Sequence, residues 1–357
     1  MTRTSLAPAA PERRFVTESM ERAHSVIGFG TDPTATLAWC AEVGRRAPRV
    51  GEGSTRELWE LLATTAARDV SAARMLEPHL DALSILHQAD VQLTERHDPS
   101  TSDEVGVDQN STWGVFAAEG PGMSVQAEYA SGGWRLRGTK PWCSLAAQLS
   151  HALVTASVDA ERRGLFAVRL GDPGVHPHHG PWFARGLTDV VSAPVDFDDV
   201  AAVAVGDPGW YLARPGFAWG GMSVAACWWG AAVGIADQLL TAARSERADQ
   251  VALVHLGRVD AALWAARSAL AEAADLVDGG VADSLGGRLL AERIRAIVVE
   301  AAVTTLAETD AALGPAPLVV DEAHARRVAD LHLYLRQHHG LRDFARIGRG
   351  MLAEGDA

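Results

Sequence analysis

The stretch Gly138-Thr-Lys-Pro-Trp-Cys-Ser-Leu-Ala146 decides how this chain is interpreted. Strand-like runs lie on both sides of it, at 134–137 and 151–157, and its Gly and Pro are typical of a turn. In an extended segment residues i and i+2 point the same way, so the side chains of Trp142 and Ser144 are expected to face one side together. This pair suits a flat, conjugated ligand with a polar edge. An aromatic side chain that closes a barrel end beside a solvated serine has the same pattern.

Composition limits the possible functions. The chain has 357 residues, of which 48% are hydrophobic and 22% charged, which is typical of a globular protein with two or three domains. Its formal net charge of −13 argues against nucleic-acid binding, which needs a basic surface. The three cysteines (Cys40, Cys143 and Cys227) match no zinc-ligand spacing and indicate a reducing, cytoplasmic setting.

Two segments bear on targeting and membranes. Residues 1–14 lack a continuous apolar region and are expected to form a disordered tail, not a signal peptide. Residues 216–236 carry no formal charge and approach the length of a membrane span. Trp228 and Trp229 lie near the centre of this segment, whereas spanning helices more often carry Trp at their ends. The segment is therefore predicted to be the buried central helix of a bundle, with no membrane partner.

The order of periodic segments predicts an α+β fold in three domains. Residues 15–112 form an N-terminal helical domain, residues 113–207 a β-domain with a compact antiparallel barrel or sandwich, and residues 208–357 a C-terminal helical bundle. The bundle is expected to contain four helices, at about 217–247, 255–278, 286–313 and 321–350.

Three segments of the β-domain carry a family resemblance. They are Trp113-Gly-Val-Phe-Ala-Ala-Glu-Gly-Pro-Gly122, Gly138-Thr-Lys-Pro-Trp-Cys-Ser144, and Gly186-Leu-Thr-Asp-Val-Val-Ser-Ala-Pro-Val-Asp-Phe-Asp-Asp-Val200. With the order helices, strands, helices, they resemble the acyl-CoA dehydrogenase superfamily of flavoproteins. The resemblance implies an N-terminal helical domain, a middle β-domain and a C-terminal four-helix bundle that enclose FAD and an acyl thioester.

The resemblance also implies a flavin site. Trp142 would shield the isoalloxazine, and Ser144 would donate a hydrogen bond near its N5/O4 edge, which stabilises negative charge on reduction. Ala118 and Glu119 lie in the segment whose backbone lines the flavin, although the family usually has Thr where Ala118 stands. Arg247 lies near the position of an Arg that meets the FAD pyrophosphate, but the Phe-Gly that follows it in the family is absent. A surface salt-bridge face is the alternative for Arg247.

The catalytic residue departs from the family pattern. Dehydrogenation of an acyl thioester needs a carboxylate base, and neither of the two family positions holds one in this chain. His338 falls where the second would be, and a neutral imidazole is a competent base. A His near this position also resembles the flavin monooxygenase branch, where it donates a hydrogen bond to the substrate or the flavin. A solvated pair with His339 is the structural alternative.

The predicted function is FAD-dependent α,β-desaturation of an acyl thioester carried on CoA or a carrier protein. A flavin-dependent monooxygenase that uses O₂ and reduced flavin, and a catalytically degenerate flavin-binding or structural subunit, are the alternatives. The resemblance implies a homodimer or homotetramer. No metal site is predicted, because the His176-Pro-His-His179 run lies in a Pro/Gly loop without nearby acids. Three acids (Glu119, Asp330 and Asp343) are interpreted as structural partners.

Overall fold

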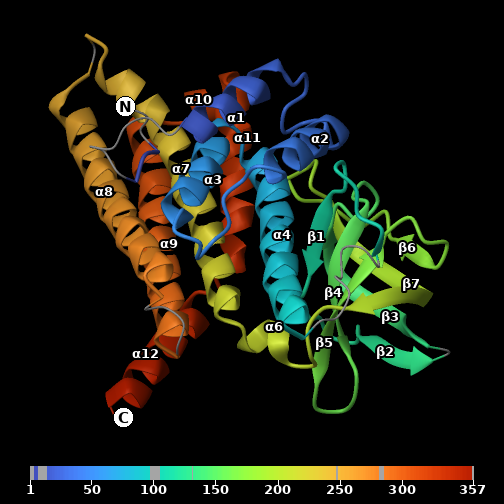
Figure 1. Cartoon of the computed structure of the whole chain (residues 1–357). Helices are drawn as coiled ribbons and strands as arrows, with labels where there is room; N and C mark the ends of the chain where they lie inside the picture. Colours follow the sequence, from blue (N-terminus) through green and yellow to red (C-terminus); the bar gives the residue numbers. More distant parts are fainter. Residues whose placement is uncertain are drawn as a thin grey trace.

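The computed structural model describes residues 4–6, 14–96, 105–130, 132–246, 248–280 and 285–355. Helices form one side of the molecule and strands the other, and α4 runs between them (Figure 1). The N-terminal helices are α1 (Arg14–Ser25), α2 (Pro33–Gly44), α3 (Thr55–Arg68) and α4 (Val70–Arg96). Asp32 caps α2 by accepting a hydrogen bond from the Ala35 amide, as its place before Pro33 predicts.

The described part of the N-terminal segment is packed, so the expected disordered tail is wrong for residues 4–6. Leu6 is only 3% exposed, and its amide donates to Glu60 Oε1 at 2.7 Å. The hydroxyls of Thr4 and Thr64 lie 2.8 Å apart. The burial of the Leu6 side chain and these hydrogen bonds offset the conformational entropy that is lost when this short segment becomes ordered. The rest of the expected tail lies outside the described residues, apart from the start of α1.

The strands form a closed barrel with mixed pairing. They are β1 (Trp113–Phe116), β2 (Val125–Ala130), β3 (Gly133–Ser144), β4 (His151–Ser157), β5 (Arg163–Arg169), β6 (Val175–Pro177) and β7 (Ser192–Ala204). Their order is β1-β4-β2-β3-β7-β5, and β5 also pairs with β4, which closes the ring. Because β1 and β2 pair with β4 in parallel, the expectation of a purely antiparallel domain is wrong.

The stretch 138–144 is the second half of β3, not the predicted turn. Its register against β7 shifts between Lys140 and Cys143, and Trp142 adopts a left-handed backbone with φ of 59°. The Trp142 side chain is consequently 60% exposed, whereas Ser144 is buried. The expectation that they face one side together is therefore wrong, because the irregular backbone breaks the strand alternation on which it depended.

The C-terminal helices are α6 (Trp210–Ala213), α7 (Pro215–Ala243), α8 (Gln250–Asp278), α9 (Leu285–Leu313), α10 (Ala316–Val320), α11 (Glu322–Tyr334) and α12 (Leu341–Gly355). The apolar helix α7 packs against α8, α9 and α11 and against the N-terminal helices α3 and α4. Although α7 is long and apolar enough to cross a membrane, 72% of its most apolar window is buried inside the protein. α7 is therefore buried, as expected for the central bundle helix that the sequence predicts.

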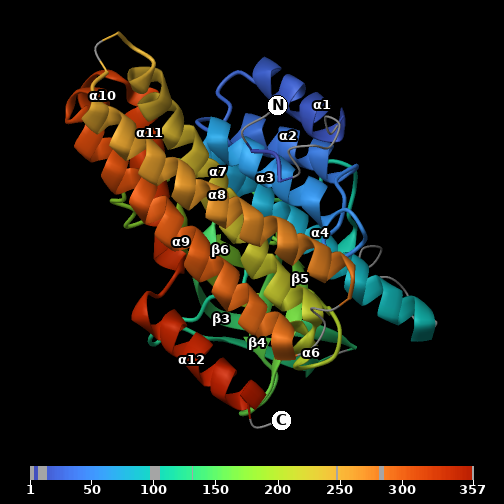
Figure 2. The same ribbon diagram turned by 90° about the vertical axis from the view of Figure 1, so that its left-hand side faces the viewer.

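The predicted fourth helix of the bundle is broken. A 3-10 turn, Leu335–Gln337, separates α11 from α12, and Gly340 has a left-handed φ of 58° that favours glycine. α12 consequently folds back beside the lower half of α9 (Figure 2). The prediction of one continuous helix over 321–350 is wrong, and the bend places α12 where it closes one side of the cavity described below.

Close packing of α3 against α7 depends on Gly230. A Cβ at this position would overlap the backbone of Ala63 on α3. We expect Gly230→Val to lower the free energy of unfolding by about 3 kcal/mol, because the two helix backbones must separate. Urea denaturation measures this. The matched control is Gly257→Val on α8, where none of the described atoms lies within 4 Å of an added Cβ. Equal effects of the two substitutions would contradict the prediction.

Candidate functional site

The three segments that carry the family resemblance meet at one end of the barrel. Lys140 Nζ donates to Glu119 Oε1 at 2.9 Å, which joins the first segment to the second. The hydroxyls of Ser144 and Ser192 lie 2.7 Å apart, which joins the second segment to the third. Residues far apart in the sequence are thus brought together around β3, where Lys140 and Ser144 are buried and the Trp142 side chain is exposed.

Glu119 is a structural partner, as predicted. Lys140 is buried, and its Nζ also donates to Thr155 Oγ1 at 2.8 Å. Burial lowers the pKa of Lys140, while the contact with Glu119 raises it. Glu119 also lies 3.3 Å from Arg163. One carboxylate oxygen of Glu119, Oε1, is therefore engaged by two cations, while Ala118 beside it is exposed.

Arg74 of α4 connects Ser144 to the helices. Its Nη2 donates to Ser144 Oγ at 3.0 Å, and its guanidinium lies 5.8 Å from the centre of the Tyr334 ring. Arg74 Nη1 is buried and has no hydrogen-bond partner among the described residues. An unpaired buried donor is costly, so this nitrogen is suited to the polar edge of a ligand.

A large cavity lies on the helical side, between α4, α6, α7, α9 and α12. Its volume is about 900 Å³, within the range of small-molecule sites. Gly220 and Gly221 of α7 face it, and a Cβ at Gly220 would lie 3.1 Å from Asp81 Oδ1. Its walls are mainly apolar, and they include Leu212, Phe217, Ala218, Val224, Leu289 and Ala291.

Two carboxyl groups, Glu77 and Asp81, lie one turn apart on α4 and line this cavity. Glu77 is only 8% exposed, and it has no hydrogen bond or ion pair within the described part of the chain. Burial first, and then the neighbouring Asp81, raise its pKa to about 8, against the opposing effect of Arg74 and Arg295. Burial also raises the pKa of Asp81, and Arg214 lowers it. Such perturbed groups in a cavity indicate a functional site.

The arginines of the cavity are already engaged within the protein. Each donates to a neighbouring acceptor: Arg214 to Gln88 Oε1 at 2.8 Å, Arg288 to Leu212 O at 2.7 Å, Arg295 to Gly221 O at 3.0 Å and Gln337 O at 2.9 Å, and Arg346 to Glu292 at 2.8 Å and Asp343 at 2.6 Å. Arg295 also lies 4.6 Å from the centre of the Trp228 ring. Each arginine thus has at least one acceptor in the walls, while Arg214 Nε is buried without a partner among the described residues and the Glu77 carboxyl is left for a ligand.

His338, the predicted catalytic residue, lies in the turn before α12 and is not among the residues that line the cavity. Its Nδ1 accepts from the Gly340 amide at 3.2 Å, and its Nε2 lies 3.7 Å from Asp343. Burial lowers the pKa of His338, so its imidazole is neutral at neutral pH. The solvated alternative is wrong for His338, which is buried, although His339 is exposed. The Nε2 of His338 is buried and has no hydrogen-bond partner among the described residues, and the catalytic role of His338 stays a prediction.

Other predicted residues are not part of this site. Arg247 lies outside the described residues. His178 pairs with Asp196 at 2.8 Å, and the described residues contain no group of three potential metal ligands. Glu77 and Asp81 were not predicted from the sequence as site residues. The sequence pattern that could have identified them is a pair of acids at positions i and i+4 of an amphipathic helix, on the side that packs toward α7.

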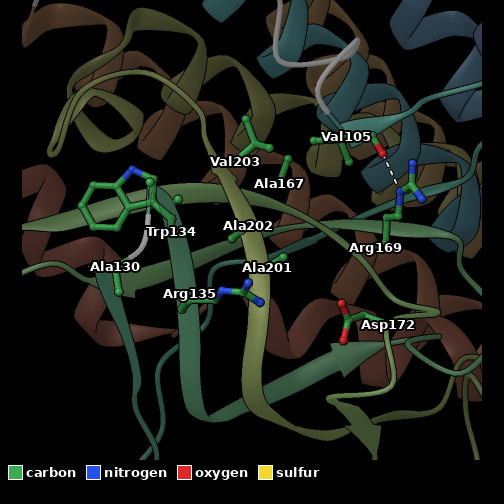
Figure 3. A pocket seen from close by; sticks show the side chains of 12 residues that line it. Val105, Ala130, Trp134, Arg135, Ala167, Arg169, Asp172, Ala201, Ala202 and Val203 are labelled. Atoms are coloured by element: carbon green, nitrogen blue, oxygen red, sulfur yellow. Dashed lines mark hydrogen bonds between the residues drawn. The ribbon is translucent and has the colours of Figure 1, made fainter.

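A second pocket, of about 270 Å³, lies on the β-domain between β2, β3, β5 and β7. Figure 3 shows Trp134 and Arg135 on one side of it and Arg169 on the other, where Arg169 Nε donates to Val105 O at 2.7 Å. Among the described residues that line it, no buried polar atom lacks a partner. The cavity at Glu77 is therefore the better candidate site.

Comparison with known proteins defines the class of fold. No family model matches the sequence, and no curated protein matches it. KijD3 in complex with FMN and a dTDP-linked amino-keto sugar has a TM-score of 0.75 at 19% identity, over 94% of this chain and 92% of that chain. Dibenzothiophene monooxygenase TdsC from Paenibacillus sp. A11-2 has a TM-score of 0.78 at 15% identity, over 96% and 98%. The nitrososynthase from Micromonospora carbonacea var. africana has a TM-score of 0.73 at 17% identity, over 94% of each chain.

These proteins share the acyl-CoA dehydrogenase fold. This chain has that fold, and the predicted resemblance is confirmed at this level. The solved neighbours include structures of KijD3 and TdsC with FMN, and one of TdsC with FMN and indole.

Proposed function

We propose that the protein is a flavin-dependent monooxygenase that oxidises a small, mostly apolar substrate in the cavity at Glu77. The observation that carries this proposal is the buried carboxyl group of Glu77, which faces an apolar cavity of about 900 Å³. Arg74, on the same helix as Glu77, acts on the Glu77 carboxyl and donates to Ser144, where the family resemblance puts the flavin edge. The fold neighbours support the proposal, because TdsC is a monooxygenase with structures bound to FMN and indole.

The residues present fit a flavin. The exposed indole of Trp142 offers a flat surface, and its left-handed backbone is a strained feature of the kind found at ligand sites. Arg74 Nη1 offers an unpaired donor for a polar edge. When bound and reduced, a flavin supplies two electrons and activates O₂ for transfer of one oxygen atom to the substrate. The protein would contribute apolar walls that exclude water and a carboxyl that binds the substrate.

The decisive experiment supplies FMN or FAD that a separate reductase keeps reduced. The protein is incubated in air with isotopically labelled O₂ and a panel of apolar aromatic compounds, and products are analysed by mass spectrometry. We expect one labelled oxygen atom in a product. Hydrogen peroxide as the only product with every compound would contradict the proposal. Comparing FMN with FAD also identifies the cofactor.

Desaturation of an acyl thioester is the second candidate. One observation favours it. Neither of the two positions at which the family carries its base holds an acid in this chain, but Glu77 places a carboxyl group in the cavity. Here Glu77 would remove the α-proton, and FAD would be the expected cofactor. An acyl-CoA added without oxygen should then bleach a bound flavin. The monooxygenase reaction needs O₂, so this anaerobic measurement separates the two candidates.

Trp142 provides a test of the flavin site. We expect Trp142→Ala to weaken flavin binding about 10-fold, because an aromatic contact on a flat ligand is lost. Stability should change by less than about 0.5 kcal/mol, since the indole is exposed. Fluorescence titration with FMN measures the affinity. The control is Tyr129→Ala, which removes a 63% exposed aromatic side chain from β2 in the same barrel. Equal affinity of both variants would contradict the assignment.

We also propose that the protein is a homodimer or homotetramer. Apolar side chains of α8 and α9 are exposed, among them Leu253, Trp264 and Val303. Contiguous exposed apolar side chains are typical of protein–protein contacts. Sedimentation velocity gives the assembly state, and a monomer at micromolar concentration would contradict this proposal.

A further inference from the structure

We propose that Glu77 accepts the proton of a neutral aromatic substrate that carries one O–H or N–H group, such as a phenol or an N–H heteroaromatic ring. This inference rests on the proposed monooxygenase function, and it names both a substrate class and a catalytic residue. It begins from one feature of the cavity: a carboxyl group without a partner among the described residues, in a wall whose arginines are all engaged.

The lack of a partner defines what the ligand must offer. A buried polar group without a hydrogen bond costs free energy, and a ligand donor would recover it. Glu77 is one of the residues that line the cavity, so its carboxyl group is accessible from there. Gly220 and Gly221 of α7 also line the cavity, where an added Cβ would meet Asp81 and Arg295 respectively. The ligand that fits has one donor and is otherwise apolar.

The charges around Glu77 favour a neutral ligand. Arg74 and Arg295 are close enough to act on its pKa, so they would repel a cationic amine. An anion would meet the carboxyl groups of Glu77 and Asp81, while the arginines already have protein partners. The charged and titratable groups that face this region are Arg74 and Asp81 of α4, Tyr211 of α6, Arg214 before α7, Cys227 of α7, Arg288, Glu292 and Arg295 of α9, Tyr334 of α11 and Arg346 of α12.

The walls favour an aromatic ligand. Phe217 and Leu212 lie on one side of the cavity and Leu289 on another. A volume of about 900 Å³ accepts a ligand of two or three fused rings with space to spare. Mainly apolar walls with a small number of placed polar groups are the arrangement that orients a ligand by its polar atoms.

The proposed step transfers one oxygen atom of O₂ to the substrate ring. Glu77 takes the proton of the substrate O–H or N–H, which makes the ring electron-rich. One atom of O₂ forms a bond to a ring carbon as a hydroxyl group and the other leaves as water. The reduced flavin would supply two electrons and two protons, one proton to the new hydroxyl and one to the water. The hydrogen lost from that carbon restores the O–H or N–H as a proton, and the proton on Glu77 completes the water. The products are a hydroxylated ring, water and oxidised flavin.

The test uses flavin-free protein, so it does not depend on turnover. β-Naphthol and its methyl ether have almost the same shape, but only the naphthol has a donor. Fluorescence titration should show that naphthol binds about 10-fold tighter above pH 8, as one hydrogen bond to a charged group predicts. The preference should fall as pH drops through about 8, because Glu77 becomes protonated.

Three variants complete the test. Glu77→Gln should reduce the preference for naphthol to less than about 3-fold and remove its pH dependence. Glu77→Asp, which keeps the carboxyl, should retain part of both. Glu128→Gln, which changes an exposed side chain on β2, should match the wild type. Equal binding of naphthol and ether, no binding of either, or an unchanged preference in Glu77→Gln would overturn the inference.

This result is separable from the proposed function. A donor preference that depends on Glu77, together with peroxide as the only product under reduced flavin and O₂, would support the binding site and reject the monooxygenase. Labelled oxygen in a product with Glu77→Gln as active as the wild type would support the monooxygenase and reject the role of Glu77.

Discussion

Replacing Asp330 with alanine is expected to lower the free energy of unfolding by about 3–5 kcal/mol. Asp330 is buried on α11, where it accepts hydrogen bonds from the Leu187 amide and, at 3.1 Å, from Ser71 Oγ. Arg326 Nε lies 3.6 Å from the same carboxylate. One side chain thus joins a loop of the β-domain to α4 and α11. Its removal leaves two donors and a guanidinium buried without this acceptor.

Urea denaturation at neutral pH measures this effect. Asp330→Asn keeps the size but offers one acceptor oxygen instead of two, so we expect roughly half the loss. Asp198→Ala on the exposed part of β7 is the matched control and should change stability by less than about 0.5 kcal/mol. If Asp330→Ala lowers the free energy of unfolding by less than about 1 kcal/mol, these three contacts do not hold the β-domain loop, α4 and α11 together.

Replacing Glu77 with glutamine is expected to stabilise the protein, by an amount that grows with pH. The pKa of Glu77 is raised from 4.5 to about 8 in the folded protein, chiefly by burial. The folded state therefore binds more protons than the unfolded state between these values, and the stability of the wild type falls as pH rises through this interval. Glutamine does not titrate. The gain should be near zero below pH 4.5 and on the order of 3 kcal/mol above pH 8.

Melting temperatures measured by calorimetry across this pH range test the expectation. The profiles of wild type and Glu77→Gln should converge at acid pH and separate at alkaline pH. Parallel profiles would mean that Glu77 titrates normally and does not face a dry cavity. The same variant should lose most of its oxygenation activity, because a carboxyl group kept at a cost in stability is typical of a functional site.

Much of the fold follows from local sequence patterns. The apolar period of the helices and the alternation of the strands locate most elements, because burial on one face imposes those periods. The errors have a different origin. At Trp142 a bulge, held by pairing with β7, overrides the alternation. At Gly340 the chain bends, so that α12 returns to α9 and does not continue α11.

The site was predicted less completely. The segments around Trp142 and Ser144 were identified because their residues are adjacent in the sequence and resemble a family pattern. His338 was placed by counting along a helix that proved to be broken. Glu77 was missed, since an acid on an amphipathic helix is usually exposed, and only its neighbours show that it is buried.

The sequence by itself determined the succession of helices, strands and helices, the buried character of α7, and the segments that resemble flavoproteins. These depend on local periodicity and on residues that are close along the chain. Only the tertiary structure decided that Trp142 is exposed while Ser144 is buried, and that Glu77 faces a cavity. The cavity is enclosed by α4, α7, α9 and α12, and the pKa of Glu77 depends on the burial and the charges that these distant elements bring together.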